Sequence, residues 1–421
     1  MKYAKFVNTK PVGYHDVVRM TNMGDSVQAF AVNHLFRYAG VNQNDVIGIP
    51  CRSAEAEEPC YLVVQGHFGR QYDMGFMHND NIYPIFIGFA LKDVFLTDEE
   101  VRYFKKYEPI LCRDELTKNT LTGYGVEAYL SGCLSVCFPK RDQHAKGKRD
   151  KYYFVDVKKP FLDLVPENIK QNAVYTSQNL YMDEVNVDSM ERGDQMAWKL
   201  IKEYSDNAKM VITSRLHCMT PCMAMGIPTI AVGNNFSHRY SFVDAFLESY
   251  DEEQFAGFDW SIPKGKADVE EVKELLLCAG KSMLARNPDM DKIKRLDQFY
   301  SNRNRWLYCK GIKKELKTIF NGVERPEYIL WGASSGGFAV YEALRDLWPN
   351  QEMVAIVDSY AEGIFGGKVI RKPEEAIVKN PNAIVIISTM SGLESAEELL
   401  QKLDKKRDRD YFVVHENKIG G

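Results

Sequence analysis

The 421-residue chain lacks several features that would place it in a common functional class at once. Its 54 basic and 58 acidic residues nearly balance, so it has no excess of positive charge with which to bind nucleic acid. The longest apolar run, Ile82–Leu91, is too short to cross a bilayer. The opening residues MKYAKFVNTK lack the apolar segment of a secretion signal. We therefore expect a cytoplasmic protein with no nucleic-acid partner.

The cysteines lack a metal-binding arrangement. There are nine of them, an odd number, and none forms a CxxC pair of the kind that zinc sites use. Cys218 and Cys222 lie one helical turn apart beside His217, which leaves a metal or redox site open. Burial of both thiols in a helix that faces a sheet is the simpler interpretation. The expectation is reduced cytosolic thiols and no metal site.

What the chain does contain is a repeated alternation of short apolar runs and helical patterns. Its hydrophobic content of 45% and charged content of 27% are typical of a globular protein, and its length exceeds one ordinary core. The alternation predicts an α/β protein with parallel, doubly wound sheets. We expect an N-terminal Rossmann-like lobe at 1–150, a second lobe at 151–265, a helical connector at 266–325 and a small Rossmann-like domain at 326–421.

Apolar runs and helical spacing locate the main elements. Strands are predicted at Tyr61–Val64, Ile82–Ile87, Pro109–Cys112, Tyr153–Val157, Ala173–Thr176, Lys209–Thr213 and Pro228–Val232. Helices are predicted at Asp25–Tyr38, Ala267–Leu284 and, with the same spacing, over Asp289–Phe320. The basic segment KRDQHAKGKRDK at 140–151 is predicted to be an exposed loop between the lobes, and peripheral contact with anionic lipid at the inner membrane face is left open.

The most informative segment is MVITSRLHCMTPCMAMGIPTIAVGN at 210–234. It predicts a strand, a helix over Leu216–Met225 capped by Thr213-Ser214, and a second strand. Ser214, Arg215 and His217 would then lie at the carboxyl edge of a parallel sheet, where such sheets bind ligands. Arginine offers a fixed fork to phosphate or carboxylate, and histidine can move a proton near neutral pH. These residues alone fit a structural arginine and a buried core histidine equally well.

Four blocks in a fixed order add to this motif. They are Asn22-Met-Gly24-Asp25 before a helix, Arg113-Asp-Glu115-Leu-Thr117, Ser131-Gly-Cys133 ahead of Pro139, and Ser214–His217 followed by Gly226-Ile-Pro228. Over roughly residues 15 to 260 this order resembles the polysaccharide pyruvyltransferase family. The chain departs from the family pattern at Gly132–Pro139, where a Gly-Pro-like turn is common, and at His238-Arg239, where members carry a lysine.

The resemblance implies two Rossmann-like lobes of glycosyltransferase-B type and the transfer of pyruvate from phosphoenolpyruvate to a sugar as a ketal. It implies His217 as the acid for the enol methylene, with Arg113 and Arg215 holding the trianionic donor. The further substrate-binding residues it implies are Asn22, Gly24, Asp25, Ser214 and Arg239. Asp25 and Glu115 are candidates for a base, although capping or ion pairing fits each of them better. The chemistry requires no metal or cofactor, and the acceptor would be a sugar or lipid-linked oligosaccharide of a surface polysaccharide such as exopolysaccharide or capsule.

The last segment carries a shortened dinucleotide pattern. A strand at Tyr328–Trp331, the loop Gly332–Gly337, a helix from Phe338 to Trp348 and a strand at Val354–Val357 form a Rossmann-like unit. The candidate nucleotide ligands are Gly332, Ser334, Gly337 and Asp358, although Ser334 replaces the middle glycine. Scaffolding fits this unit slightly better than nucleotide binding. The loop also matches G-x-S-x-G, but a hydrolase triad of Ser334, Asp358 and His415 would require a larger sheet.

Two other functions stay open from the sequence. A glycosyltransferase of the same two-lobed architecture would use Arg215 to hold the diphosphate of a nucleotide sugar and His217 to contact the sugar or act as a base. A non-catalytic nucleotide-binding scaffold of a capsule assembly complex would depend on the Gly332–Gly337 loop and not on His217.

Overall fold

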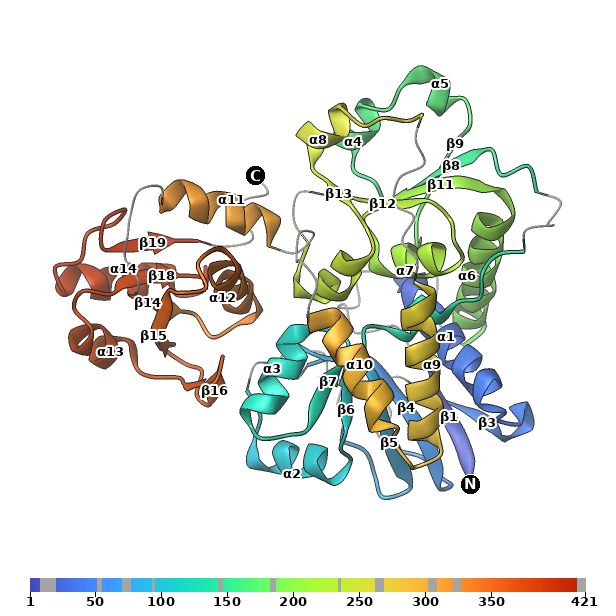
Figure 1. Cartoon of the computed structure of the whole chain (residues 1–421), viewed down its shortest axis with the longest axis horizontal. Coiled ribbons are helices and arrows are strands. Elements are labelled where there is room, and N and C mark those ends of the chain that lie inside the picture. Colours follow the sequence, from blue (N-terminus) through green and yellow to red (C-terminus); the bar gives the residue numbers. More distant parts are fainter. Residues whose placement is uncertain are drawn as a thin grey trace.

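The computed structural model describes residues 1–7, 20–50, 55–69, 77–92, 95–142, 147–181, 187–233, 236–261, 269–301, 309–320 and 327–414. Over these ranges the chain is a mixed α/β protein with three parallel sheets, which lie in three separate regions of the molecule (Figure 1). The predicted α/β class with several parallel sheets is confirmed. Cys51 and His415 lie outside the described residues.

The first sheet has the strand order β3-β1-β4-β5-β6-β7, and every neighbouring pair is parallel. Its strands are β1 (Lys2–Val7), β3 (Val46–Pro50), β4 (Cys60–Phe68), β5 (Ile82–Leu91), β6 (Ile110–Cys112) and β7 (Ala128–Leu130). Its helical segments are α1 (Met23–Ala39), η1 (Gln43–Asp45), α2 (Asp98–Lys106), α3 (Glu115–Gly123) and η3 (Leu134–Cys137). A parallel sheet buries both faces, which is why β5 is an almost unbroken apolar run.

One strand of this sheet extends beyond its predicted end. We predicted β4 to end at Val64, but it continues to Phe68 after a shift of register between Val64 and Gly66. Gly66 has a φ of 136°, which an L-residue with a side chain rarely adopts. The irregularity keeps Gln65 and His67 within the strand at its carboxyl end.

The second sheet has the order β13-β12-β11-β8-β9 and is also parallel. Its strands are β8 (Lys151–Val155), β9 (Ala173–Thr176), β11 (Ala208–Thr213), β12 (Thr229–Val232) and β13 (Ser249–Tyr250). Its helical segments are α4 (Lys159–Asp163), α5 (Glu167–Lys170), α6 (Val187–Asn207), α7 (Leu216–Ala224), η4 (His238–Ala245) and α8 (Glu252–Ala256). The short strands β2 (Met20–Asn22) and β10 (Asn179–Tyr181) pair in antiparallel fashion and join the two sheet regions.

The third sheet has the order β15-β14-β18-β19 and is parallel throughout. Its strands are β14 (Glu327–Trp331), β15 (Glu352–Val357), β18 (Ile384–Ile387) and β19 (Tyr411–Val413), and β16 (Ile364–Phe365) pairs with β17 (Lys368–Val369) beside it. The helices of this region are α11 (Lys310–Ile319), α12 (Ser335–Leu347), α13 (Pro373–Lys379) and α14 (Leu393–Lys402). We refer to residues 309–414 as the C-terminal unit.

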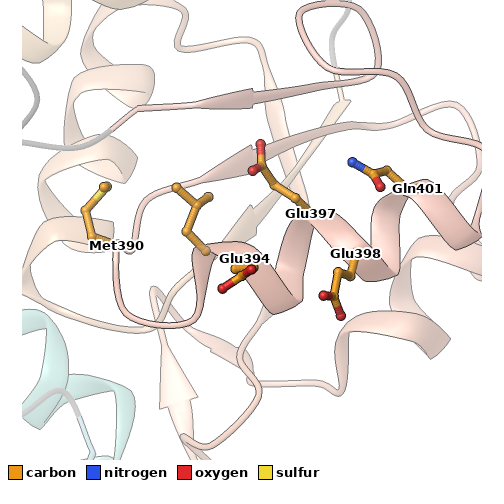
Figure 2. A pocket seen from close by; sticks show the side chains of 6 residues that line it. Met390, Glu394, Glu397, Glu398 and Gln401 are labelled. Atoms are coloured by element: carbon orange, nitrogen blue, oxygen red, sulfur yellow. The ribbon is translucent and has the colours of Figure 1, made fainter.

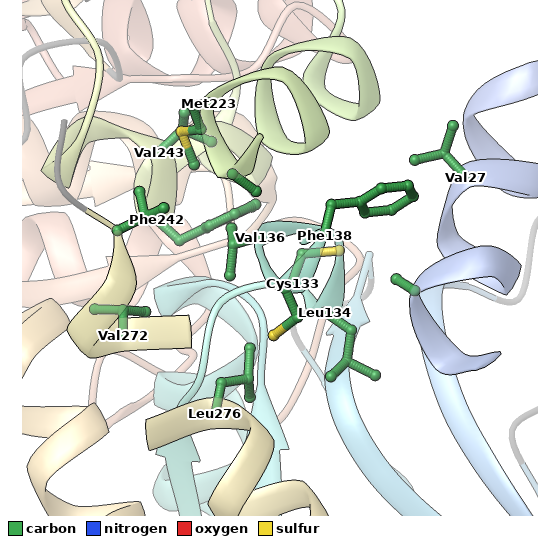
Figure 3. Packing of buried hydrophobic residues seen from close by; sticks show 14 of the residues in the cluster. Val27, Cys133, Leu134, Val136, Phe138, Met223, Phe242, Val243, Val272 and Leu276 are labelled. Atoms are coloured by element: carbon green, nitrogen blue, oxygen red, sulfur yellow. The ribbon is translucent and has the colours of Figure 1, made fainter. Parts of the chain in front are cut away.

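The largest hydrophobic core joins the first two sheet regions. It contains side chains from α1, η3, α7 and η4, together with α9 (Glu270–Leu284) and α10 (Met290–Ser301). Figure 3 shows Cys133, Leu134, Val136 and Phe138 of the η3 turn between Val27 of α1 and the side chains of α7, η4 and α9. In the described ranges, no helix combines the length and apolar character needed to cross a membrane.

Candidate functional site

The carboxyl edges of the first two sheets face each other, and direct contacts hold them together. Met23 N, at the start of α1, donates to the carbonyl oxygen of Gln178, which follows β9, at 2.8 Å. Within the second region, Gln178 Nε2 donates to the carbonyl oxygen of His217 at 3.2 Å. The hydroxyls of Ser135 in η3 and Thr220 in α7 are hydrogen-bonded at 2.7 Å, and both are buried. Loops at the carboxyl edge of a parallel sheet are where such folds bind ligands, so the junction of the two edges is the place to look for a site.

The start of α1 is pressed against His217. Asn22 caps the helix by accepting a hydrogen bond from Gly24 N at 3.1 Å. A Cβ atom at Gly24 would lie 3.1 Å from His217 Nδ1 and 3.2 Å from His217 Cβ, closer than most real Cβ contacts. Glycine therefore permits this close approach, and the motifs at residues 22–25 and 214–217 meet although about 190 residues separate them.

Arg113 is the centre of the site. It follows β6 directly, its side chain has 0% exposure, and none of its three guanidinium nitrogens has a hydrogen-bond partner within the described residues. Its nearest carboxylate, Asp114 Oδ2, lies 3.8 Å from Nε, too far for a hydrogen bond. Burial lowers the pKa of Arg113, and the nearby Arg239 adds to the effect. A buried cation without hydrogen-bonded compensation is costly, which makes this position suited to an anion.

Arg239 brings a second positive charge to the same place. It lies in η4, and its buried Nε also has no partner among the residues described. Burial raises the pKa of Asp25 to about 6, with Arg239 and Arg113 opposing the rise. Burial lowers the pKa of His217 well below its usual value, and the same two arginines lower it further. Arg113, Arg239, Asp25 and His217 thus form one electrostatic cluster.

Two histidines that we did not assign to the site also belong to this cluster. His67 is the next-to-last residue of β4, His238 is the first residue of η4, and their ring centres lie 6.0 Å apart. The Nε2 atom of each ring is buried without a hydrogen-bond partner in the described part of the chain. Burial lowers the pKa of both rings, and Arg113 and Arg239 contribute to both shifts. The position of His67 at the end of an apolar run was the available sequence signal for that residue, and for His238 the signal was its place next to Arg239.

Arg215 and Ser214 have a different environment. Arg215 Nε donates to Asp156 Oδ2 at 2.9 Å, and its side chain is 33% exposed. Ser214 Oγ donates to the carbonyl oxygen of Asp156 at 2.8 Å, so both residues anchor the end of β11 to the end of β8. The predicted capping of α7 by Thr213-Ser214 is wrong: the cap position is Arg215, without a side-chain hydrogen bond, and Thr213 Oγ1 accepts from Arg215 N at 2.9 Å.

The remaining candidates near His217 are buried. Cys133 Sγ lies 4.0 Å from His217 Nε2 and accepts a hydrogen bond from Ser135 Oγ at 3.1 Å. Cys218 and Cys222 are fully buried in α7, as the simpler interpretation of their spacing predicted. Within the described ranges, no group of three His, Cys, Asp or Glu side chains is placed to hold a metal ion.

The glycine-rich loop of the C-terminal unit is built around Asp358. Its carboxylate accepts hydrogen bonds at 2.9 Å from the backbone N–H groups of Ala333, Tyr360 and Ala361. Ser334 Oγ accepts from Gly337 N at 3.2 Å and caps α12. A Cβ at Gly337 would lie 1.9 Å from the carbonyl oxygen of Gly332, so this glycine is required by close packing. The four predicted nucleotide-binding residues, Gly332, Ser334, Gly337 and Asp358, thus lie together in the third sheet region. The contacts described in this paragraph all join residues of the C-terminal unit to one another.

A shallow hollow on the outer side of α14 lies elsewhere in the C-terminal unit (Figure 2). Its lining residues are Met390, Leu393, Glu394, Glu397, Glu398 and Gln401. Glu397 is paired with Arg407 at 2.8 Å. Three carboxylates along one face would repel an anionic substrate, so this hollow does not compete with the arginine cluster for that role.

Comparison with known proteins agrees with the site. The family model described as polysaccharide pyruvyl transferase matches residues 22–235, about half of the chain. The matched range begins at the Asn22 cap of α1, contains Arg113 and His217, and ends just before His238-Arg239. No curated protein matches the chain. The chain belongs to the polysaccharide pyruvyl transferase family.

Proposed function

We propose that this protein transfers the enolpyruvyl group of phosphoenolpyruvate to two hydroxyls of a sugar, forming a pyruvate ketal in the biosynthesis of a surface polysaccharide. The observation that carries the proposal is the fully buried guanidinium of Arg113, which has no hydrogen-bond partner among the described residues and lies near Arg239. Phosphoenolpyruvate carries a phosphate and a carboxylate, and both are groups that arginine binds strongly. The family match supports the same reaction.

Binding of the donor would also place a proton on His217. Without a bound anion, burial and the two arginines lower the pKa of this histidine and keep its ring neutral near pH 7. A bound trianion cancels the repulsion from Arg113 and Arg239, so the pKa of His217 rises as the donor binds. The ring then becomes an acid at the moment when the enol methylene needs a proton.

The reaction can be written with every atom accounted for. The π electrons of the enol form a C–H bond with the proton of His217, and the central carbon becomes electrophilic. Two acceptor hydroxyls each form a C–O bond to that carbon and each lose a proton. The C–O bond to phosphate breaks, its electron pair leaves with the phosphate, and the phosphate takes up the second proton and leaves as hydrogen phosphate. Asp25 suits the role of base for the first hydroxyl because its pKa is raised to about 6, and the proton it takes restores His217.

Arg215 has a supporting role in this proposal. Its guanidinium is already paired with Asp156, whereas Arg113 and Arg239 have nitrogens without partners in the described chain. We propose that Arg215 and Ser214 hold the two strand ends that position His217, and that Asn22 and Gly24 fix the approach of α1. We further propose that the first two sheets are the lobes of a glycosyltransferase-B-type fold, that the acceptor is a sugar or lipid-linked oligosaccharide, and that the protein works at the cytoplasmic side of the membrane.

The test is direct detection of the product. Purified protein is incubated with phosphoenolpyruvate and a panel of methyl and nitrophenyl hexosides, and mass spectrometry looks for an acceptor that has gained pyruvate minus one water. Phosphate release should accompany this gain in equal amount. His217→Gln should abolish both signals. Transfer of a hexose from a nucleotide sugar to the same panel, without any pyruvylated product, would contradict the proposal.

A further inference from the structure

His238 lies in the site, but the steps proposed for His217 and Asp25 do not use it. It opens η4 next to Arg239, its side chain is 5% exposed, and its Nε2 atom is buried without a hydrogen-bond partner within the described residues. A buried imidazole nitrogen without a partner is costly unless a ligand or water completes it. The charges of the groups around His238 limit the kind of ligand that could bind there.

The charged groups that act on His238 come from two sides. Asp114 and Arg113 approach from the start of α3, which packs against η4, and Arg239 adjoins it on η4 itself. The ring of His67 at the end of β4 lies 6.0 Å away. Burial lowers the pKa of His238 to about 4, Asp114 opposes the shift, and the two arginines reinforce it. The ring is therefore a neutral proton acceptor near pH 7, beside a carboxylate that favours its protonated form.

Ketal formation moves more protons than His217 and Asp25 handle. The two acceptor hydroxyls lose two protons in total, and the methylene carbon takes up only one. The trianionic donor releases its phosphate as hydrogen phosphate, so the second proton must travel from the second hydroxyl to the phosphate. The group that carries it has to lie beside the phosphate site, which the proposed function places at Arg113 and Arg239.

We propose that His238 is this second proton carrier, which accepts the proton of the second acceptor hydroxyl and passes it to the phosphate held by Arg113 and Arg239. This inference rests on the proposed function, because it uses the same donor and the same anion site. It adds a residue outside the matched range of 22–235. It also gives a role to the position where this chain has His238-Arg239.

The experiment measures proton uptake when inorganic phosphate, the reaction product, binds to the full chain. Calorimetric titrations at pH 7 in two buffers with different heats of ionisation give the number of protons taken up per phosphate. A bound dianion raises the pKa of nearby groups, so these groups should take up protons, while the monoanionic fraction of free phosphate releases protons on binding; the second contribution is the same for wild-type protein and variants and cancels in their difference. Asp25 and His217 contribute part of this uptake. His238→Gln should reduce it by up to one proton. His34→Gln, the same change on α1, should leave it unchanged because the charged groups that act on His34 are Lys273 and Arg37, which are not part of the cluster.

The outcomes separate the two proposals. Uptake that is the same in His238→Gln as in the wild-type protein overturns the role of His238, although phosphate still binds. If neither phosphate nor phosphoenolpyruvate binds, the proposed function itself fails. His238→Asn serves as a second variant if the glutamine variant does not fold, and circular dichroism checks the fold of each.

Discussion

Replacing Arg113 by methionine should make the empty protein more stable, which is unusual for the loss of a fully buried side chain. The pKa of Arg113 is lowered because burial and Arg239 together outweigh the attraction of nearby acidic groups. The guanidinium is therefore held at a net cost when no anion is bound. Methionine fills similar space without a charge. Replacement of whole buried ion pairs by apolar groups is often neutral or stabilising by about 1–4 kcal/mol, whereas removal of one member of a hydrogen-bonded pair destabilises. Arg113 is closer to the first case because it has no hydrogen-bonded partner among the described residues to leave behind.

The expected gain lies at the lower end of that range. Asp114 loses its nearest cation, at 3.8 Å, although Asp114 Oδ1 keeps the N–H and hydroxyl of Thr117 as donors. We expect the free energy of unfolding of Arg113→Met to exceed that of the wild-type protein by about 1–2 kcal/mol. For a cooperative unit of this size that corresponds to a rise in Tm of roughly 2–8 °C. The same variant should lose the stabilisation that phosphoenolpyruvate gives to the wild-type protein.

Arg215→Met is the matched variant, and it should make the protein less stable. Arg215→Met removes a guanidinium that donates to Asp156 at 2.9 Å, and Asp156 keeps Ser177 and Gln178 as donors. The free energy of unfolding of this variant should fall by about 1 kcal/mol, because one charge-assisted hydrogen bond at a partly exposed position is lost. Thermal denaturation of both variants without ligand is the assay. If Arg113→Met is destabilised as much as Arg215→Met or more, the Arg113 guanidinium has favourable partners in the ligand-free protein, and it is not held there at a net cost.

Three further predictions follow from single contacts. Gly24→Ala should lower kcat about tenfold, because the new Cβ displaces His217. Its Tm should stay near that of the wild type, because alanine favours the helix. Steady-state kinetics measure the first effect and melting curves the second. Asp25→Asn should become more stable than the wild-type protein as pH rises from 4 to 6, because folding raises the pKa of Asp25 to about 6. The difference in stability should level off above pH 6. Melting curves across pH measure it, and they would show no such trend if Asp25 were exposed. Asp358→Ala should destabilise the C-terminal unit by about 2 kcal/mol, detected by limited proteolysis, and leave binding of phosphoenolpyruvate unchanged; weaker donor binding would mean that the loop acts on the site.

Much of the fold was predictable because buried parallel strands are short apolar runs between polar residues. The strand predicted at Ala173–Thr176 is β9 with the same bounds, and the one predicted at Tyr328–Trp331 begins one residue earlier. The end of β4 was not predictable in the same way. The irregularity at Gly66 lets the strand continue through polar residues that normally mark its end.

The site was less predictable than the fold because its properties depend on distant segments. The sequence places Arg113 at the end of a strand, but its complete burial follows from packing by residues far along the chain. The neighbourhood of His67, Arg113 and His238 brings together the ends of β4 and β6 and the start of η4. No local pattern gives that proximity. The same limit applies to Arg215, whose partner Asp156 lies 59 residues earlier.

In the proposed reaction, Arg113 and Arg239 together bind the phosphate and carboxylate of phosphoenolpyruvate. The most direct measurement is a calorimetric titration of the wild-type protein, Arg113→Met and Arg239→Met with phosphoenolpyruvate, and of the wild-type protein with a panel of nucleotide sugars. Phosphoenolpyruvate should bind saturably, and either substitution should weaken binding by about 100-fold or more, on the order of the loss of two charge-assisted hydrogen bonds. Binding of a nucleotide sugar but not of phosphoenolpyruvate, with the same dependence on Arg113 and Arg239, would contradict this assignment.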